Sequence, residues 1–403
     1  RRLRVRAAAT ARLKGGFLRG AGHSGKAGPA FGLPRDVERL QSSDMSRLSD
    51  ARNIADLRKL AKKRLPRMVF DYIDGGADDE VALRRAEAAF AEIELTWDAL
   101  VDVSTIDTSV TLMGAPMRLP FFISPTAASR LFNPRGGEIA VARAAHGAGV
   151  AYACSTIGST TVEEIAAAAP NGPRWFQVYV WKDRALVQAT LQRAKAAGFT
   201  AIILTVDVPI AGNRERDHLN RFTIPPKVNW QTATQTLARP GYLWDLMTTP
   251  RIGPANFAHI NIDGGLMAFI NAQFDRTVTW DDVRWLRETW DGKLAIKGLS
   301  TPDDARRAIA AGADVVWVSN HGGRQLGAAP ATIDTLPAIA DAVRGDAQIV
   351  LDGGVRRGSD VIKALALGAN AVALGRAYLW GLAAGGEAGV ARALALLEEE
   401  LRR

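Results

Sequence analysis

The sequence predicts an α/β protein whose main part is a (β/α)8 barrel, the TIM-barrel fold. Eight short apolar runs follow one another from about residue 119, and amphipathic helical patterns separate most of them. Runs that are apolar throughout are typical of parallel strands covered by helices on both faces. Eight is the number of strands that closes such a barrel. The runs span residues 119–124, 150–155, 174–180, 201–207, 294–298, 315–320, 349–352 and 371–375.

The helical patterns between these runs favour the same fold. They include residues 138–148, 184–197, 302–311 and 360–367, and several are followed by a glycine, as in Ala-Gly-Ala at 311–313. Glycine often ends a helix because it adopts the left-handed backbone conformation without strain. An open, doubly wound sheet is the alternative, but no Gly-x-Gly-x-x-Gly motif follows the first run to favour it.

Residues 48–403 are predicted to form one domain, with two parts that do not belong to the barrel repeat. Residues 48–118 have the pattern of a helical lead-in followed by a short β segment. Residues 208–280 form a long insertion after the fourth strand, rich in prolines and aromatic side chains. A long insertion at the active-site end of a barrel is usually a lid or a binding loop. Its aromatic content also suits contact with a membrane surface or a partner, and both interpretations stay open.

The net charge of +9 comes from the N-terminal segment. Residues 1–35 hold nine of the 51 Lys and Arg residues and no acid, so the other 42 basic residues balance the 42 acidic ones. A neutral folded part gives no reason to expect nucleic-acid binding. Residues 1–47 are expected to be a disordered basic extension, either an organelle-targeting peptide or a translated segment upstream of Met45. This segment has no apolar stretch long enough for a signal peptide or a membrane span.

The cysteine count bears on the compartment. Cys154 is the only cysteine, so an internal disulfide is excluded and a reducing compartment is favoured. We therefore expect a cytoplasmic protein or one bound peripherally at the inner membrane, and no Cys/His cluster indicates a metal site.

Polar residues gather where the eight apolar runs end. In a barrel these ends form the active site, and polar residues on apolar strands are costly unless they are paired or bind something. Together they predict a ligand site. The residues are Ser124, Pro125, Thr126 and Ala127; Ser155; Gln177 and Tyr179; Thr205 and Asp207, with Arg214 beyond; Lys297; Ser319, His321 and Arg324; Asp352, Gly353, Gly354 and Arg356; and Gly375 and Arg376.

Three of these features indicate chemistry. His321 supplies a base that works near neutral pH. Arg324 supplies a cation that can bind a carboxylate through two parallel hydrogen bonds. Glycines and arginines after the last two runs are typical of a phosphate site. A buried Lys297 is either a Schiff-base nucleophile or a fixed charge beside an anionic cofactor.

Six ordered motifs in residues 50–400 resemble the FMN-dependent 2-hydroxy-acid oxidoreductases, a family that includes glycolate oxidase, lactate oxidase, flavocytochrome b2 and bacterial L-lactate and mandelate dehydrogenases. The motifs are Leu-Pro-Arg-Met-Val-Phe-Asp-Tyr at 65–72, Pro-Thr-Ala at 125–127, Phe-Gln-Val-Tyr at 176–179, Leu-Thr-Val-Asp at 204–207, Ser-Asn-His-Gly-Gly-Arg-Gln at 319–325 and Asp-Gly-Gly-Val-Arg-Arg-Gly at 352–358.

The resemblance implies a role for each residue. His321 would be the base, with Asp207 stabilising its charged form. Arg214 and Arg324 would bind the substrate carboxylate, and Tyr72 and Tyr179 would contact its carboxylate or hydroxyl. The implied FMN ligands are Pro125, Thr126, Ala127, Ser155, Gln177 and Thr205 around the ring; Lys297 at the N1/O2 edge, with Ser319 nearby; and Asp352, Gly353, Gly354, Arg356, Gly375 and Arg376 along the ribityl and phosphate.

The electron acceptor is harder to predict. Ile157 stands where glycolate oxidases have Trp, and residues 212–217 with the long insertion look like lactate and mandelate dehydrogenases, which reduce a quinone or cytochrome. Ala127 stands where some mandelate dehydrogenases have Gly, which points the other way. We expect an L-lactate dehydrogenase-like homotetramer. An oxidase that forms hydrogen peroxide from oxygen is the alternative, and a Lys297 Schiff-base aldolase and a non-catalytic FMN-binding barrel are remoter ones.

Overall fold

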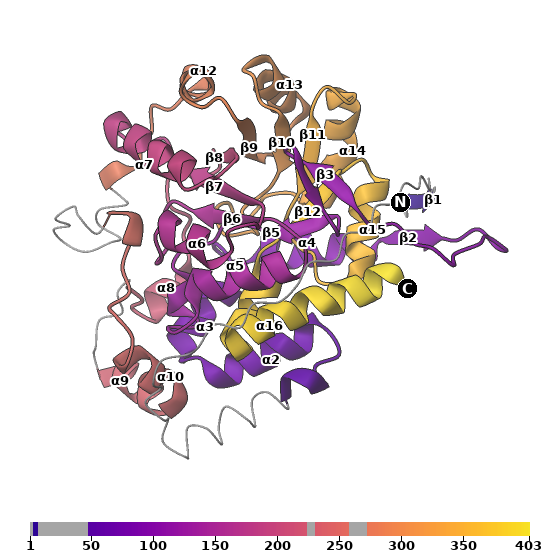
Figure 1. The fold of residues 1–403 in the computed structure, drawn as a ribbon. Coiled ribbons are helices and arrows are strands. Elements are labelled where there is room, and N and C mark those ends of the chain that lie inside the picture. Colours follow the sequence, from indigo (N-terminus) through magenta and orange to yellow (C-terminus); the bar gives the residue numbers. More distant parts are fainter. Residues whose placement is uncertain (1–2, 7–46, 224–229, 258–271) are drawn as a thin grey trace, which may run out of the picture.

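The structure, a computed structural model, describes residues 3–6, 47–223, 230–257 and 272–403. At its centre is a closed barrel of eight parallel strands, β5 to β12 in sequence order (Figure 1). Each predicted apolar run coincides with one strand, so the (β/α)8 prediction is confirmed. The strands are β5 (Phe121–Ile123), β6 (Tyr152–Ser155), β7 (Arg174–Val178), β8 (Ala201–Thr205), β9 (Lys293–Leu299), β10 (Val315–Val318), β11 (Gln348–Leu351) and β12 (Ala371–Leu374).

Helices cover the outside of the barrel. Side chains just before the helices cap several of them: Thr161, Asp183 and Thr301 each accept a hydrogen bond from a backbone N–H of the first turn. Gly312 ends one helix with φ of +94°, as the Ala-Gly-Ala motif predicted. The helices are α5 (Gly137–Gly147), α6 (Val162–Ala168), α7 (Arg184–Ala196), α12 (Trp280–Thr289), α13 (Pro302–Ala310), α14 (Thr332–Val343), α15 (Gly358–Ala366) and α16 (Arg376–Arg402).

The inside of the barrel is filled by one apolar cluster, called the interior layer below. Because side chains alternate along a strand, every second residue points inward. Six of the twelve inward positions are alanine, which leaves room for Phe122, Trp175 and Trp317. The Phe122 ring meets the two indole rings edge-on, with centroids 4.9 and 5.2 Å away. The layer consists of Phe122, Ala151, Ala153, Trp175, Ala201, Ile203, Ala295, Val315, Trp317, Val350, Ala371 and Ala373.

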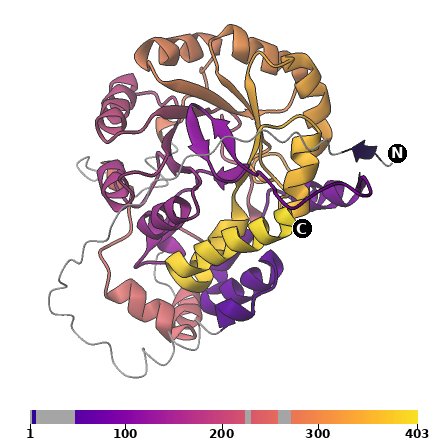
Figure 2. The same ribbon diagram turned by 45° about the vertical axis from the view of Figure 1, so that its right-hand side comes forward.

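The lead-in packs on two sides of the barrel. It contains α2 (Ile54–Arg64), α3 (Arg67–Asp74), α4 (Val81–Ala91), β2 (Ile93–Thr96) and the hairpin β3 (Val110–Leu112)–β4 (Ala115–Met117). The hairpin closes the N-terminal end of the barrel, since Leu112, Met113 and Met117 pack against the interior layer. At the other side, α2 lies along α16 (Figure 2).

The insertion after β8 carries helices in its described parts: α8 (Glu215–Leu219), α9 (Trp230–Leu237), α10 (Pro240–Met247) and the short η2 (Ala255–Phe257). Residues 224–229 and 258–271 of the predicted insertion lie outside the described residues. Of the predicted N-terminal extension, Leu3–Arg6 form β1, which pairs in parallel with β2, and residues 7–46 lie outside the described residues. Within the described parts of the chain, no helix is both long and apolar enough to span a membrane.

Candidate functional site

A ring of polar residues lies at the C-terminal end of the barrel. Each is two positions beyond an inward residue of the apolar layer and therefore faces the same way. The strand ends thus converge as the sequence predicted. The polar members are Ser124, Ser155, Gln177, Thr205, Lys297, Ser319 and Asp352, and Gly375 completes the ring.

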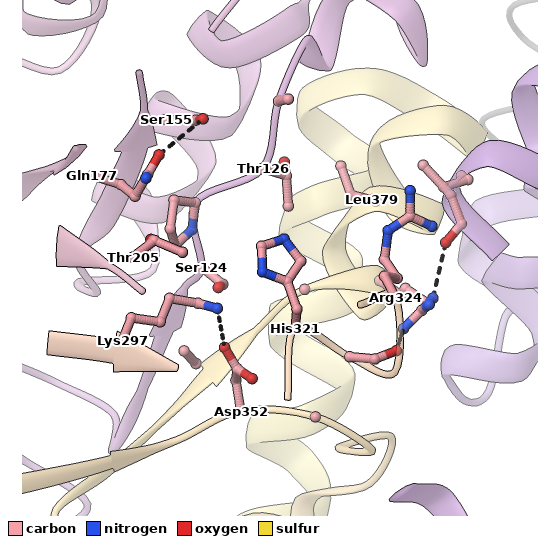
Figure 3. Close-up of a pocket in the computed structure, with 18 of the residues that line it drawn as sticks. Ser124, Thr126, Ser155, Gln177, Thr205, Lys297, His321, Arg324, Asp352 and Leu379 are labelled. Atoms are coloured by element: carbon pink, nitrogen blue, oxygen red, sulfur yellow. Dashed lines mark hydrogen bonds and ion pairs between the residues drawn. The ribbon is translucent and has the colours of Figure 1, made fainter. Parts of the chain in front are cut away.

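These strand ends open into one pocket, which brings the predicted residues together. Every predicted site residue lines it except Asp207 and Ser319. Those two lie directly behind it. Asp207 is hydrogen-bonded to His321, and Ser319 to both Lys297 and Asp352. Figure 3 shows His321 between the Lys297–Asp352 pair and Arg324.

His321 has the geometry of a base. Its Nδ1 lies 2.9 Å from Oδ1 of Asp207, so Nδ1 carries the proton and the Nε2 lone pair remains for a ligand. Burial lowers the pKa of His321, and Asp207 opposes that shift without cancelling it. The imidazole is therefore neutral at pH 7.

The turn that carries His321 needs its glycines. His321 itself has φ of +56°, and Gly323 has φ of +72°. A Cβ on Gly323 would lie 2.6 Å from the backbone nitrogen of Leu83 in α4. The turn is thus packed directly against the lead-in, which fixes where the histidine points.

Two arginines and two tyrosines line the same pocket as His321. The Arg324 guanidinium donates from Nη1 to the carbonyls of Tyr72 (2.6 Å) and Gly75 (2.9 Å), and lies 5.0 Å above the Tyr72 ring. Burial and the nearby charge of Arg214 lower the pKa of Arg324 to about 10, so the Arg324 guanidinium remains cationic at pH 7. Burial likewise raises the pKa of Tyr179, which stays protonated. Two neighbouring cations with hydroxyl donors suit a carboxylate.

Lys297 and Asp352 form a buried ion pair. Nζ of Lys297 lies 3.3 Å from Oδ2 of Asp352 and donates to Oγ of Ser319 at 2.9 Å. Burial opposes the charge of Lys297, but Asp352 and Asp207 outweigh it and raise its pKa. A permanently protonated lysine is a poor amine nucleophile, which argues against the Schiff-base alternative.

Hydrogen-bond donors at the strand ends indicate that the pocket binds a planar polar ligand. Oε1 of Gln177 accepts from Oγ of Ser155 (3.2 Å) and from the Thr156 N–H (3.3 Å). Nε2 of Gln177 and Oγ1 of Thr205 are buried and have no protein partner. Because an unpaired buried donor is costly, both groups fit a cofactor ring that accepts hydrogen bonds.

The far end of the pocket suits a phosphate. Gly375 precedes the first turn of α16, whose backbone N–H groups and helix dipole favour an anion. Arg376 beside it donates to the carbonyls of Ile73, Gly75 and Gly322, and burial together with Arg324 and Arg356 lowers its pKa. Glycines 353 and 354 complete this end. Phosphate at one end and a hydrogen-bonding ring at the other match FMN.

Several functional residues escaped the sequence reasoning. Glu138 in α5 is fully buried and accepts hydrogen bonds from Ser129, Ser159 and Thr160, so it ties the loops after β5 and β6 together. No motif marks this residue. Tyr378 is hydrogen-bonded to Thr126.

The pocket also has apolar walls that the sequence reasoning missed. Leu379 could have been found, because it lies three residues after Arg376 on the same helix face. Phe274, near the end of the insertion, meets Tyr179 edge-on at 5.4 Å. These residues line the pocket together with Phe132, Val208 and Ala211.

Comparison with known proteins agrees with this site. The family model described as FMN-dependent dehydrogenase matches residues 61–403. An L-lactate oxidase of Nostoc sp. is 42% identical over 89% of this chain and 94% of its own length. An L-lactate dehydrogenase of Alcaligenes faecalis is 41% identical over 86% and 92%. The crystal structure of the monotopic membrane protein (S)-mandelate dehydrogenase superposes with a TM-score of 0.83 and 39% identity, covering 88% and 94% of the two chains.

The matched region contains the complete barrel and every residue of the predicted site. Both the extent of the match and the identity of the relatives establish the family, and with it the requirement for FMN. The chain belongs to the FMN-dependent 2-hydroxy-acid oxidoreductases.

Proposed function

We propose that this protein oxidises an L-2-hydroxy acid of the lactate type to the 2-oxo acid and passes the electrons to a quinone or a cytochrome. The observation that carries the proposal is the His321–Asp207 pair, which lies in one pocket with two arginines and two tyrosines. His321 supplies a base, and the arginines and tyrosines supply a carboxylate-binding site. Both lie next to the part of the pocket that fits the cofactor ring.

Substrate binding rests on Arg214 and Arg324. Their guanidinium groups form charge-assisted hydrogen bonds with the substrate carboxylate, and Tyr72 and Tyr179 donate to its carboxylate or hydroxyl. These contacts orient the substrate so that its oxidisable carbon lies next to Nε2 of His321.

Proton removal rests on His321. Oxidation of a 2-hydroxy acid releases two electrons and two protons, and Nε2 accepts one of those protons. The resulting imidazolium is stabilised by Asp207, which accepts the Nδ1 hydrogen bond. When bound, FMN would accept the electron pair together with the other proton.

The remaining predicted residues would hold FMN. Gln177, Thr205 and Ser155 would hydrogen-bond the ring, and Pro125, Thr126 and Ala127 would line it. Lys297 would place its charge beside the ring, with Ser319 and Asp352 holding the lysine. The ribityl and phosphate would be held by Asp352, Gly353, Gly354, Arg356, Gly375 and Arg376.

The acceptor and the surroundings of the site belong to this proposal. The long insertion after β8 and the likeness to a monotopic membrane dehydrogenase support a membrane-bound quinone or a cytochrome as acceptor, with peripheral membrane contact. Phe274 from the insertion lines the pocket, which supports a lid role for this part of the chain. Relatives with oxidase names support the alternative, oxygen reduction to hydrogen peroxide. We further propose a homotetramer.

Anaerobic reduction tests the proposal directly. The flavin absorbance of the purified holoenzyme should bleach with L-lactate and not with D-lactate, and a panel of 2-hydroxy acids gives the side-chain preference. The reduced enzyme is then mixed with oxygen or with a soluble quinone. We expect fast reoxidation by the quinone. Fast reoxidation by oxygen would favour the oxidase, and no bleaching by any 2-hydroxy acid would refute the proposed reaction.

A further inference from the structure

Trp317 of the interior layer interacts with both members of the buried Lys297–Asp352 pair. It is fully buried on β10, and its indole Nε1–H donates to Oδ2 of Asp352 at 3.0 Å. Lys297 is its register partner on β9, and the lysine Nζ lies 5.7 Å from the centre of the indole ring. That distance is within the range of a cation–π contact.

We propose that Trp317 is a positioning residue that holds the Asp352 carboxylate away from the Lys297 ammonium and thereby raises the reduction potential of bound FMN. The proposal rests on the function proposed above, in which the charge of Lys297 faces the FMN ring. Trp317 does not line the pocket, so its effect on the site passes through Asp352 and Lys297, with which it interacts.

The hydrogen bonds of Asp352 explain how this works. Oδ1 accepts from Oγ of Ser319 at 2.7 Å, whereas Oδ2 is shared between Trp317 and Lys297. The Lys297–Oδ2 separation of 3.3 Å is longer than the 2.7–2.9 Å of a typical charge-assisted hydrogen bond. The indole N–H therefore competes with Lys297 for Oδ2 and weakens the ion pair between Lys297 and Asp352.

The direction of the effect follows from this geometry. Without the indole donor, Oδ2 closes on Nζ and neutralises more of the lysine charge. Lys297 then stabilises negative charge on the reduced cofactor less, while the neutral oxidised ring is affected less. Reduction of FMN becomes harder.

Trp175 provides a matched control. It lies in the same interior layer, is fully buried and meets Phe122 edge-on, as Trp317 does. However, its Nε1 has no hydrogen-bond partner. Trp175→Phe and Trp317→Phe therefore remove the same atoms from the same layer, and only the second removes a donor from Asp352.

The test measures the FMN potential of the two variants and of the wild-type holoenzyme by equilibration with redox dyes, using a chemical reductant. We expect Trp317→Phe to disfavour reduction about tenfold, which is a fall of about 30 mV for a two-electron couple. Titration of the apoprotein with oxidised FMN should give a Kd that changes less than tenfold. Trp175→Phe should keep the wild-type potential. Equal potentials in the two variants would refute the proposal.

Two further measurements keep the test decisive. If Trp317→Phe fails to fold, 3-benzothienylalanine at position 317 replaces the N–H by sulfur in a ring of nearly the same shape. A wild-type potential in that protein would also refute the proposal. In an Asp352→Asn background, Trp317→Phe should change the potential no further. Because a chemical reductant drives the measurement, it stays valid even if no 2-hydroxy acid bleaches the flavin, so the two proposals can fail separately.

Discussion

At the scale of single residues, the site depends on opposing influences on His321. Burial favours the neutral imidazole, and Asp207 favours the charged one. Burial also disfavours the charge of Asp207, but His321 and Lys297 outweigh it and lower the pKa of that carboxyl. The pair therefore consists of a carboxylate and a neutral imidazole at pH 7, which is the state that a base needs before the reaction.

Asp207→Asn tests this balance. The base is active when neutral, so kcat/KM falls as the pH drops through the pKa of His321, which lies below its ordinary value of 6.5. The substitution removes the charge that raises this pKa, so the acid limb of the pH profile should move to lower pH. The rate on the plateau should fall about 100-fold or more, because the imidazolium formed during reaction loses its partner. The pH dependence of kcat/KM checks both effects.

His321→Ala is the control for this experiment, and it should lose the acid limb altogether. An acid limb that moves to higher pH in Asp207→Asn would contradict the assigned pairing. FMN content, read from the flavin absorbance, should stay at the wild-type level in both variants.

At the scale of elements, α3 links the lead-in to the site. Its C-terminal carbonyls accept from Arg324 and Arg376, so two pocket arginines are oriented by a helix end. Its Asp74 is buried and bound by Arg58 of α2 at 2.5 and 2.7 Å and by Arg216 of α8 at 3.2 Å. One helix thus connects α2, the insertion and the pocket.

Asp74→Asn should destabilise the fold in a pH-dependent way. Burial opposes the charge of Asp74, but Arg58, Arg216 and Arg376 outweigh it and lower its pKa. A lowered pKa stabilises the folded state above the ordinary value of 3.8, and this contribution is lost as the pH falls through the lower folded value. The variant should lose about 1–3 kcal/mol of unfolding free energy at pH 7, as expected for hydrogen bonds to a charged group.

Urea unfolding at pH 7 and below pH 4 checks this result. The difference between wild type and variant should shrink at the lower pH, where the wild-type carboxyl becomes protonated. An unchanged difference across this range would mean that packing, rather than the carboxylate charge, accounts for the effect. Asp56→Asn is a suitable control, because Asp56 forms an exposed pair with Lys59.

At the scale of the whole molecule, the sequence predicted the features that follow from the order of residues along the chain. The eight strands were predictable because each is a short apolar run, and the site because parallel strand ends converge at one end of a barrel. Contacts between residues far apart were not predictable. The Trp317–Asp352 hydrogen bond joins residues 35 positions apart, and the Glu138 network depends on how three segments pack. Pairing of β1 with β2 likewise has no sequence signal.

A chain that begins at Met45 should keep the fold and the cofactor. All eight barrel strands lie between Phe121 and Leu374, and α2 packs on α16 without residues 1–44. The short β1–β2 pairing is lost, but two isolated strands are marginally stable at best, so its loss should cost little. We expect wild-type FMN content and kcat, and a Tm within about 4 °C of the full chain since that shift corresponds to roughly 1–2 kcal/mol. Retention on a cation exchanger should weaken, because residues 1–44 hold ten basic residues and only three acidic ones. Loss of FMN or a large drop in Tm would show that residues 1–44 belong to the folded domain.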